Sequence, residues 1–262
     1  GVANLQSATQ VEKISRQGID VMIALDVSRS MLSQDVKPSR LEKAKQLVNK
    51  LMDQLSNDRV GLVIFAGRAY MQMPLTSDHT AARLYINNAS PDAVPTQGTV
   101  IAEALRICNT GFSKKEKKYK TILLITDGED HDDEAVKVAK QLAENGVIIN
   151  TIGVGSTEGG VIVNALTGEP KRDIQGNVIV SKLNEPELID IASNAHGIYQ
   201  QLNDVGSVVE KIQSQTLSME QKTISDNSTL NFRSFFQWFL ALALIAFIGE
   251  LFISEKRKTK RS

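Results

Sequence analysis

Cysteine, histidine and aromatic residues are all scarce in this sequence of 262 residues, which has one cysteine, three histidines and 5% aromatic side chains. A single cysteine excludes an internal disulfide and argues against a cysteine-based metal site. Cys108 falls in a helical pattern, which favours packing in a core over reactivity. The chain also lacks an excess of either charge, with 30 basic and 30 acidic residues. Nothing in this composition indicates nucleic-acid binding.

The first residues, GVANLQ, contain no initiator methionine, no charged segment and no apolar run. No signal peptide is therefore expected within them, and the start resembles a processed or trimmed end. We treat residues 1–18 as a lead-in to the first strand.

One long hydrophobic run is present, FFQWFLALALIAFIGELFI at residues 235–253. A helix of this length reaches across the roughly 30 Å hydrocarbon layer of a bilayer. Aromatic residues at its start and the basic tail at 254–262 are typical of a transmembrane helix with a cytoplasmic C-terminus. The alternative is a buried C-terminal core helix, which needs neither feature. Residues 1 to about 234 are then expected on the outer side of the membrane.

Apolar runs at 20–25, 59–66, 121–126 and 146–155 alternate with helical patterns at 39–55, 99–107, 132–146 and 185–197. Runs that are apolar on both faces are typical of parallel strands covered on both sides. The pattern predicts an α/β fold with a doubly wound, mostly parallel sheet and helices on both faces.

Two further segments interrupt this alternation. Residues 69–76 resemble an edge strand, and residues 161–183 carry Thr-Gly and Gly-Asn turns, which indicates a β-hairpin insertion. We expect one domain over residues 19–205, followed by a helix and juxtamembrane spacer at 206–234.

Two of the predicted strands end in an aspartate, Asp26 in MIALD and Asp127 in LLITD. The carboxyl ends of parallel strands share one edge of a sheet, so we expect the two acids to lie close together. Buried carboxylates repel each other, and a divalent cation would relieve that repulsion. Ser28 and Ser30 follow Asp26 at alternate positions in DVSRS. These hard oxygen donors indicate Mg²⁺, with Mn²⁺ or Ca²⁺ possible, and argue against Zn²⁺.

The motif DVSRS after a strand resembles the D-x-S-x-S of the metal-ion-dependent adhesion site in von Willebrand factor type A (vWA) domains, which have a Rossmann-like fold. The resemblance spans residues 19–202 and includes RLEKAK, DRVGLVIFAG, PLTSD, a GT loop and LLITDGED, in that order. It implies that Thr99 of the GT loop joins Asp26, Ser28, Ser30 and Asp127 in holding the metal. By position alone, Thr99 would serve as a helix N-cap in any case.

Within that family the sequence is most similar to the membrane-anchored bacterial Bat group, named for aerotolerance operons. The resemblance implies a non-enzymatic domain whose metal captures an Asp or Glu of a partner protein. It also implies partners among other Bat-type membrane proteins and MoxR-type AAA+ ATPases.

Two alternatives remain open. A Mg²⁺-dependent phosphohydrolase of the haloacid-dehalogenase type also places an acid after a strand, but its general acid would stand at Ser28. The other is a cytosol-facing co-chaperone of the ATPase, which requires the opposite membrane orientation.

Overall fold

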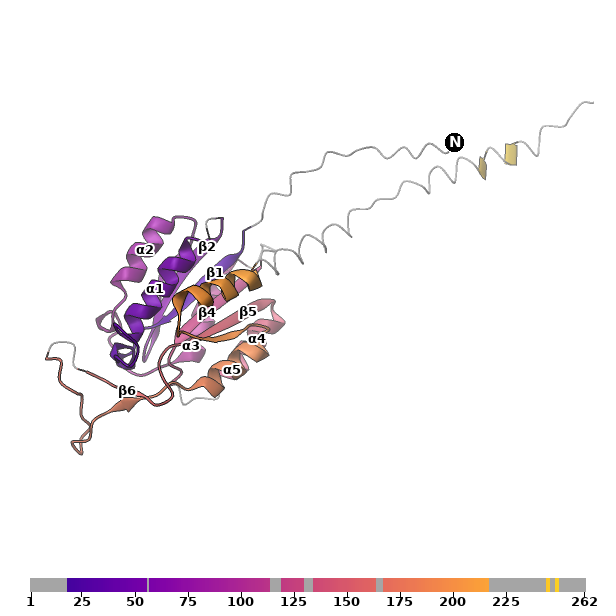
Figure 1. Cartoon of the computed structure of the whole chain (residues 1–262). Coiled ribbons are helices and arrows are strands. Elements are labelled where there is room, and N and C mark those ends of the chain that lie inside the picture. Colours follow the sequence, from indigo (N-terminus) through magenta and orange to yellow (C-terminus); the bar gives the residue numbers. More distant parts are fainter. Residues whose placement is uncertain are drawn as a thin grey trace, which may run out of the picture. The chain divides into compact units, whose positions relative to one another are not determined.

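A six-stranded sheet forms the centre of the molecule, in the order β3-β2-β1-β4-β5-β8 (Figure 1). The computed structural model describes residues 18–55, 57–113, 119–129, 134–163, 167–216, 244–245 and 248–249. The strands of the sheet are β1 (Asp20–Asp26), β2 (Arg59–Phe65), β3 (Ala69–Thr76), β4 (Lys120–Thr126), β5 (Val147–Gly153) and β8 (Tyr199–Gln201).

The sheet is mostly parallel, as predicted. β1 pairs in parallel with both β2 and β4, and only β3 runs antiparallel, at the edge beside β2. Strand order reverses between β1 and β4, because the chain adds β2 and β3 on one side of β1 and then β4, β5 and β8 on the other. Such a reversal opens a crevice at the carboxyl ends of the two central strands.

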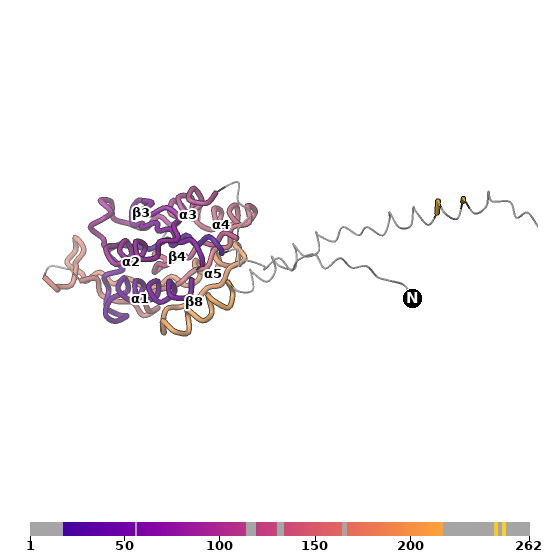
Figure 2. The backbone as a smooth tube through the Cα atoms, turned by 90° about the horizontal axis from the view of Figure 1, so that it is seen from above, coloured from indigo at the N-terminus to yellow at the C-terminus, as the bar shows by residue number. Residues whose placement is uncertain are grey.

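Helices cover both faces of the sheet (Figure 2). Alternate residues of β1 enter two separate cores: Ile23 and Leu25 pack on one face, Met22 and Ala24 on the other. This explains why the run is apolar at every position. The first face is covered by α1 (Arg40–Met52) and α2 (His79–Asn88), and the second by α3 (Ile101–Thr110), α4 (Glu134–Glu144) and α5 (Glu185–Asn194).

The helix boundaries follow local chemistry. The Ser39 hydroxyl accepts a hydrogen bond from the Glu42 N–H at 3.2 Å and so caps the start of α1. Gly146, the second residue after α4, adopts a φ of +77°, a conformation that glycine takes without steric cost. Helix α2 was not predicted, because only Ala82 and Ile86 of its ten residues are buried.

The predicted hairpin insertion is confirmed. β6 (Gly160–Val161) pairs antiparallel with β7 (Val180–Ser181), and bridges at Val163–Pro170 and Arg172–Val178 extend the insertion. It projects from the end of the domain at which β1 and β4 finish (Figure 1).

A helix at residues 205–216 follows β8. Its residues Val208, Val209 and Ile212 are buried in the same core as α1. The compact unit that contains the sheet runs to Glu220. The helix therefore adds to the domain beyond the boundary expected at residue 205.

The second unit, Gln221–Ser262, holds the predicted membrane span and basic tail. Both lie outside the described residues, apart from 244–245 and 248–249, which are helical. Within the described part of the chain, no helix combines the length and hydropathy that a membrane crossing requires. The lead-in at 1–17 and the rest of the spacer at 217–234 also lie outside the described residues.

The buried face of the 205–216 helix can be tested with one substitution. Ile212→Ala is expected to lower the free energy of unfolding by about 2–4 kcal/mol, because a buried side chain is replaced by a partial void. Glu210→Ala, on the exposed side of the same helix, should change it by less than about 0.5 kcal/mol. Chemical denaturation followed by circular dichroism makes the comparison, and equal effects would contradict this packing.

Candidate metal centre

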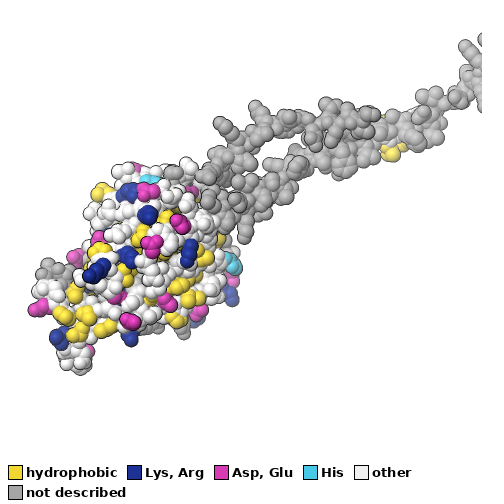
Figure 3. Space-filling view, viewed as in Figure 1, with side chains coloured by type: hydrophobic (Ala, Val, Ile, Leu, Met, Phe, Trp, Pro, Cys, Tyr) yellow, Lys and Arg dark blue, Asp and Glu magenta, His cyan; other side chains and the backbone are white. Residues whose placement is uncertain are grey.

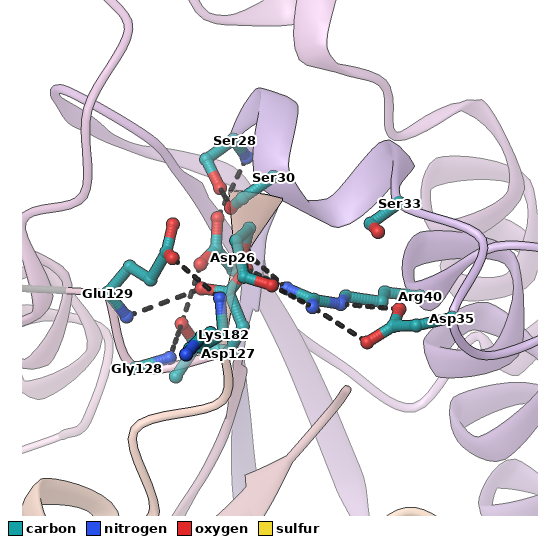
Figure 4. A network of polar contacts seen from close by, with 12 residues as sticks. Asp26, Ser28, Ser30, Ser33, Asp35, Arg40, Asp127, Gly128, Glu129 and Lys182 are labelled. Carbon is teal, nitrogen blue, oxygen red and sulfur yellow. Dashed lines mark hydrogen bonds and ion pairs between the residues drawn. The ribbon is translucent and has the colours of Figure 1, made fainter. Parts of the chain in front are cut away.

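The DVSRS segment leaves the sheet at the end of β1 and turns at once into a short 3₁₀ helix, η1 (Arg29–Leu32). The Ser28 N–H donates to Asp26 Oδ1 at 2.8 Å, and this bond folds the loop back over the carboxylate. The hydroxyls of Ser28 and Ser30 lie 2.8 Å apart and gather beside Asp26 (Figure 4). All three side chains are buried, so the loop presents one cluster of oxygen atoms.

Thr126, which the sequence analysis did not single out, completes the environment of Asp26. Its hydroxyl donates to Asp26 Oδ2 at 2.6 Å and accepts from the Gly128 N–H at 3.0 Å. Burial, followed by the charge of Asp127, raises the pKa of Asp26 to about 7, although the bonds from Thr126 and Ser28 act in the opposite direction. Within the part of the chain that the structure describes, no basic side chain forms an ion pair with Asp26.

Asp127 follows β4 and is also fully buried. Its Oδ2 accepts a hydrogen bond from Arg40 Nη1 at 2.8 Å, and its Oδ1 accepts from the Glu129 N–H at 3.3 Å. Arg40 also forms a bidentate ion pair with Asp35, so its guanidinium lies between the two acids (Figure 4). Burial alone would raise the pKa of Asp35, but bonds from Arg40 and the Ser156 N–H hold it below its usual value.

Thr99 is placed differently from the other four residues. It is partly exposed and precedes α3, whose N-cap is Val100 without a side-chain bond, so the prediction that Thr99 caps this helix is wrong. Its loop passes the carboxyl end of β2, where the Gly67 N–H donates to Thr96 O at 3.0 Å. Among the described residues, no hydrogen bond joins Thr99 to Asp26, Ser28, Ser30 or Asp127. The structure thus gathers four of the five predicted ligands and brings the loop of the fifth to the same edge of the sheet.

The gathered donors suit a hard divalent cation. Two carboxylates and two hydroxyls offer only oxygen, which Mg²⁺, Mn²⁺ and Ca²⁺ accept. Across the described ranges, no group of three or more His, Cys, Asp or Glu side chains is arranged to hold a metal. The gathered donors do not form such a group, because only two of them are carboxylates and the other two are hydroxyls. Burial and the charge of Asp127 raise the pKa of Asp26, and a bound cation would relieve both effects.

Comparison with known proteins identifies the family to which this chain belongs. The model of the von Willebrand factor type A domain matches residues 21–129. The crystal structure of BatB from Bacteroides thetaiotaomicron is 44% identical, with a TM-score of 0.75, and the match covers 78% of this chain and 100% of that one. The chain belongs to the vWA family, in its BatB group.

A second structure, of an aerotolerance-related membrane protein from Bacteroides fragilis, is 42% identical with a TM-score of 0.74, over 77% of this chain and all of that one. The proximal thread matrix protein 1 of the mussel byssus, solved with a zinc-occupied MIDAS motif, is 20% identical with a TM-score of 0.57, over 77% of this chain and 46% of that one. That likeness shows the vWA fold alone.

An uncharacterised protein of Borreliella burgdorferi is 28% identical over 250 residues, which cover 91% of this chain and 71% of that protein. A relative from Nocardia farcinica is 29% identical over 182 residues, 64% of this chain. The chain spans only 52% of that relative's length.

The buried acids of the vWA domain make the stability of the metal-free protein dependent on pH. Because the pKa of Asp26 is higher in the folded state than in the unfolded chain, its contribution is present at low pH and is lost as the pH rises through about 7. In EDTA, the free energy of unfolding should fall between pH 5 and pH 8, by at most about 4 kcal/mol from this group.

Denaturant titrations at the two pH values measure this change. Asp26→Asn, which cannot ionise, should flatten the dependence, and a wild-type stability that is level or rises over this interval would contradict the assignment.

Proposed function

We propose that this protein is a membrane-anchored vWA domain that binds a divalent cation and uses it to capture an acidic side chain of a partner protein. The metal ligands are Asp26, Ser28, Ser30, Thr99 and Asp127, and Mg²⁺ is the leading candidate, with Mn²⁺ and Ca²⁺ as alternatives. One observation carries the proposal. Two buried carboxylates meet at the strand-order reversal beside two hydroxyls, and one of them, Asp26, has no ion-pair partner among the described residues.

The chemistry of the donors supports capture of an anion. Ser28 and Ser30 bring no charge, so a bound dication keeps positive charge and can accept a carboxylate from outside. The mussel protein with its zinc-occupied MIDAS motif supports metal binding by this fold. In this chain the hard oxygen donors favour Mg²⁺ over Zn²⁺.

A protein partner is also supported by the hairpin next to the centre. Four of its apolar side chains are exposed, and Figure 3 shows hydrophobic atoms gathered on this projecting part of the domain. They are Val161 (38%), Ile174 (97%), Val178 (36%) and Val180 (49%). Exposed apolar side chains that gather in one place are typical of protein contact sites.

Membrane anchoring rests on the apolar run at 235–253 and the basic residues after it. We infer an inner-membrane protein with a periplasmic vWA domain and a cytoplasmic C-terminus. The names of the two Bacteroides relatives, BatB and aerotolerance-related membrane protein, support a Bat-type role. Assembly with other Bat-type proteins and a MoxR-type ATPase belongs to the same proposal.

The proposed function is non-enzymatic. A phosphohydrolase of the type considered above needs a second acid two residues after Asp26, and Ser28 occupies that position with its hydroxyl bonded to Ser30.

Metal binding gives the first test. Mg²⁺ should raise the thermal unfolding midpoint of the wild type, since a ligand at 100 times its Kd stabilises the folded state by about 2.7 kcal/mol. Ser28→Ala should weaken binding at least about tenfold, because a hydroxyl donor to the ion is lost.

Ser33→Ala provides the matched control. Ser33 belongs to the same loop, but its hydroxyl donates to Val161 O at 3.3 Å and lies away from Asp26 (Figure 4). Partner capture in a pull-down should require Mg²⁺ and disappear in EDTA and with Asp26→Ala. Equal metal binding by both serine variants, or capture that persists in EDTA, would contradict the proposal.

Membrane orientation gives the second test. The one native cysteine, Cys108, is buried, and burial raises the pKa of its thiol, so it should not react with a maleimide. Ile174→Cys, at the exposed hairpin tip, should react with a membrane-impermeant maleimide added outside spheroplasts. Ser262→Cys in the basic tail should react only after lysis. The reverse pattern would favour the cytosol-facing co-chaperone.

A further inference from the structure

The Arg40 guanidinium is the most highly coordinated polar group beside the metal centre. Its side chain is fully buried, and all five of its N–H groups have acceptors within 2.9 Å. The acceptors come from three separate segments: both oxygens of Asp35, Oδ2 of Asp127, and the hydroxyl and carbonyl of Ser181.

Burying Arg40 at this position has a free-energy cost, which other interactions must offset. Arg40 is the first residue of α1, where the helix dipole disfavours a positive charge, and a buried cation must be paired to be tolerated. Asp35 alone would satisfy that need through its bidentate pair. The remaining donors instead reach Asp127 and the hairpin, which lie 87 and 141 residues away in the sequence.

The base of the hairpin is fitted closely to this network. In the β6–β7 pair, Gly160 lies opposite Ser181, and a Cβ on Gly160 would come within 2.8 Å of the Asp35 side chain. Gly155, with a φ of +132°, leaves room for Arg40, because a Cβ there would lie 2.8 Å from Arg40 Cζ. The hairpin therefore cannot move away from the domain without breaking bonds to Arg40.

Asp127 is held on one side only. Arg40 and the Ser181 hydroxyl, at 3.4 Å, both bind its Oδ2. Its Oδ1 has the Glu129 N–H at 3.3 Å as its one hydrogen bond among the described residues. The carboxylate is thus fixed in orientation with one oxygen weakly engaged.

We propose that Arg40 is a positioning residue that fixes Asp127 for the cation and ties the metal centre to the base of the hairpin at residues 160–181. This rests on the proposed metal-dependent function. Coupling free energies are reciprocal. If ordering of the hairpin raises the affinity for the metal by some factor, bound metal then shifts the equilibrium toward the ordered hairpin by the same factor. A partner that binds the ordered hairpin more tightly than the disordered one therefore also strengthens metal binding.

Arg40→Lys tests the link while keeping the charge. Lysine has three donors and no planar fork, so it cannot hold Asp35, Asp127 and Ser181 together. In the full chain, calorimetry should show Mg²⁺ affinity lower by roughly tenfold. Hydrogen exchange of residues 160–163 and 178–182 should become faster, with or without metal.

Arg59→Lys is the matched control. Arg59 forms a comparable bidentate pair with the buried Asp20, at the opposite end of β1. It should leave both Mg²⁺ affinity and hairpin exchange unchanged. If Arg40→Lys behaves like Arg59→Lys in both measurements, the link does not exist.

Arg40→Gln distinguishes a positioning role of Arg40 from an effect of its positive charge alone. If Arg40 acted only as a nearby positive charge, its removal would tighten Mg²⁺ binding, because cation–cation repulsion is relieved. Positioning predicts weaker binding instead, and tighter binding would overturn the proposal.

Ser181→Ala provides a second route should the Arg40 variants fail to fold. It removes one bond to Arg40 and one to Asp127 but leaves both ion pairs in place. Weaker Mg²⁺ binding with faster hairpin exchange supports the link, and no change in either overturns it. If the wild type takes up no divalent ion, the proposed function fails, whereas hairpin exchange in EDTA still decides whether Arg40 holds the hairpin.

Discussion

Two buried carboxylates at the ends of two adjacent strands set the main constraint on this molecule. Asp26 and Asp127 are both fully buried, and the charge of Asp127 disfavours ionisation of Asp26. Hydrogen bonds from Ser28 and Thr126 reduce this penalty for Asp26, and Arg40 compensates Asp127. The balance leaves a negative site that a divalent cation would neutralise, and the proposed metal-dependent capture of a partner depends on this imbalance.

The topology of the sheet places Asp26 and Asp127 close together. β1 and β4 are adjacent and parallel, with Leu25 in register with Ile125, so the residues that follow them emerge at the same edge. The strand order reverses at the same place, and α1 and α3 pack on opposite faces of the sheet. Residues 21–25 of β1 and 122–125 of β4 are all apolar, so the polar groups that follow them are concentrated at the carboxyl ends of the two strands.

The hairpin gives this BatB-type vWA domain a surface of its own beside the metal centre. Its strands alternate in the usual way, so that Gly160 and Ser181 lie toward Asp35 and Arg40 while Val161 and Val180, the next pair, are exposed. One side of this short ribbon is thus bonded to the network around Asp127, and the other is available to a partner. Arg40 connects the two through direct bonds to Asp127 and Ser181.

The sequence by itself determined the periodicities and the short motifs. Runs apolar at every position predicted a sheet covered on both faces, and DVSRS with LLITD predicted which oxygens would gather, because these signals are local and repeat along the chain. The boundaries were less certain: α2 has too few buried positions to be recognised, and Val100 rather than Thr99 caps α3.

Only the tertiary structure decided which distant groups complete the site. Thr126 is 100 residues from Asp26, and Arg40 lies 87 residues from Asp127 and 141 from Ser181. Arg40 and Thr126 lie within the RLEKAK and LLITD motifs, but no local pattern shows which distant groups they contact. An arginine at the start of a helix and a serine in a hairpin are typical of surface positions. Their roles arise because the sheet buries them against one another, where an unpaired charge or hydroxyl would be costly.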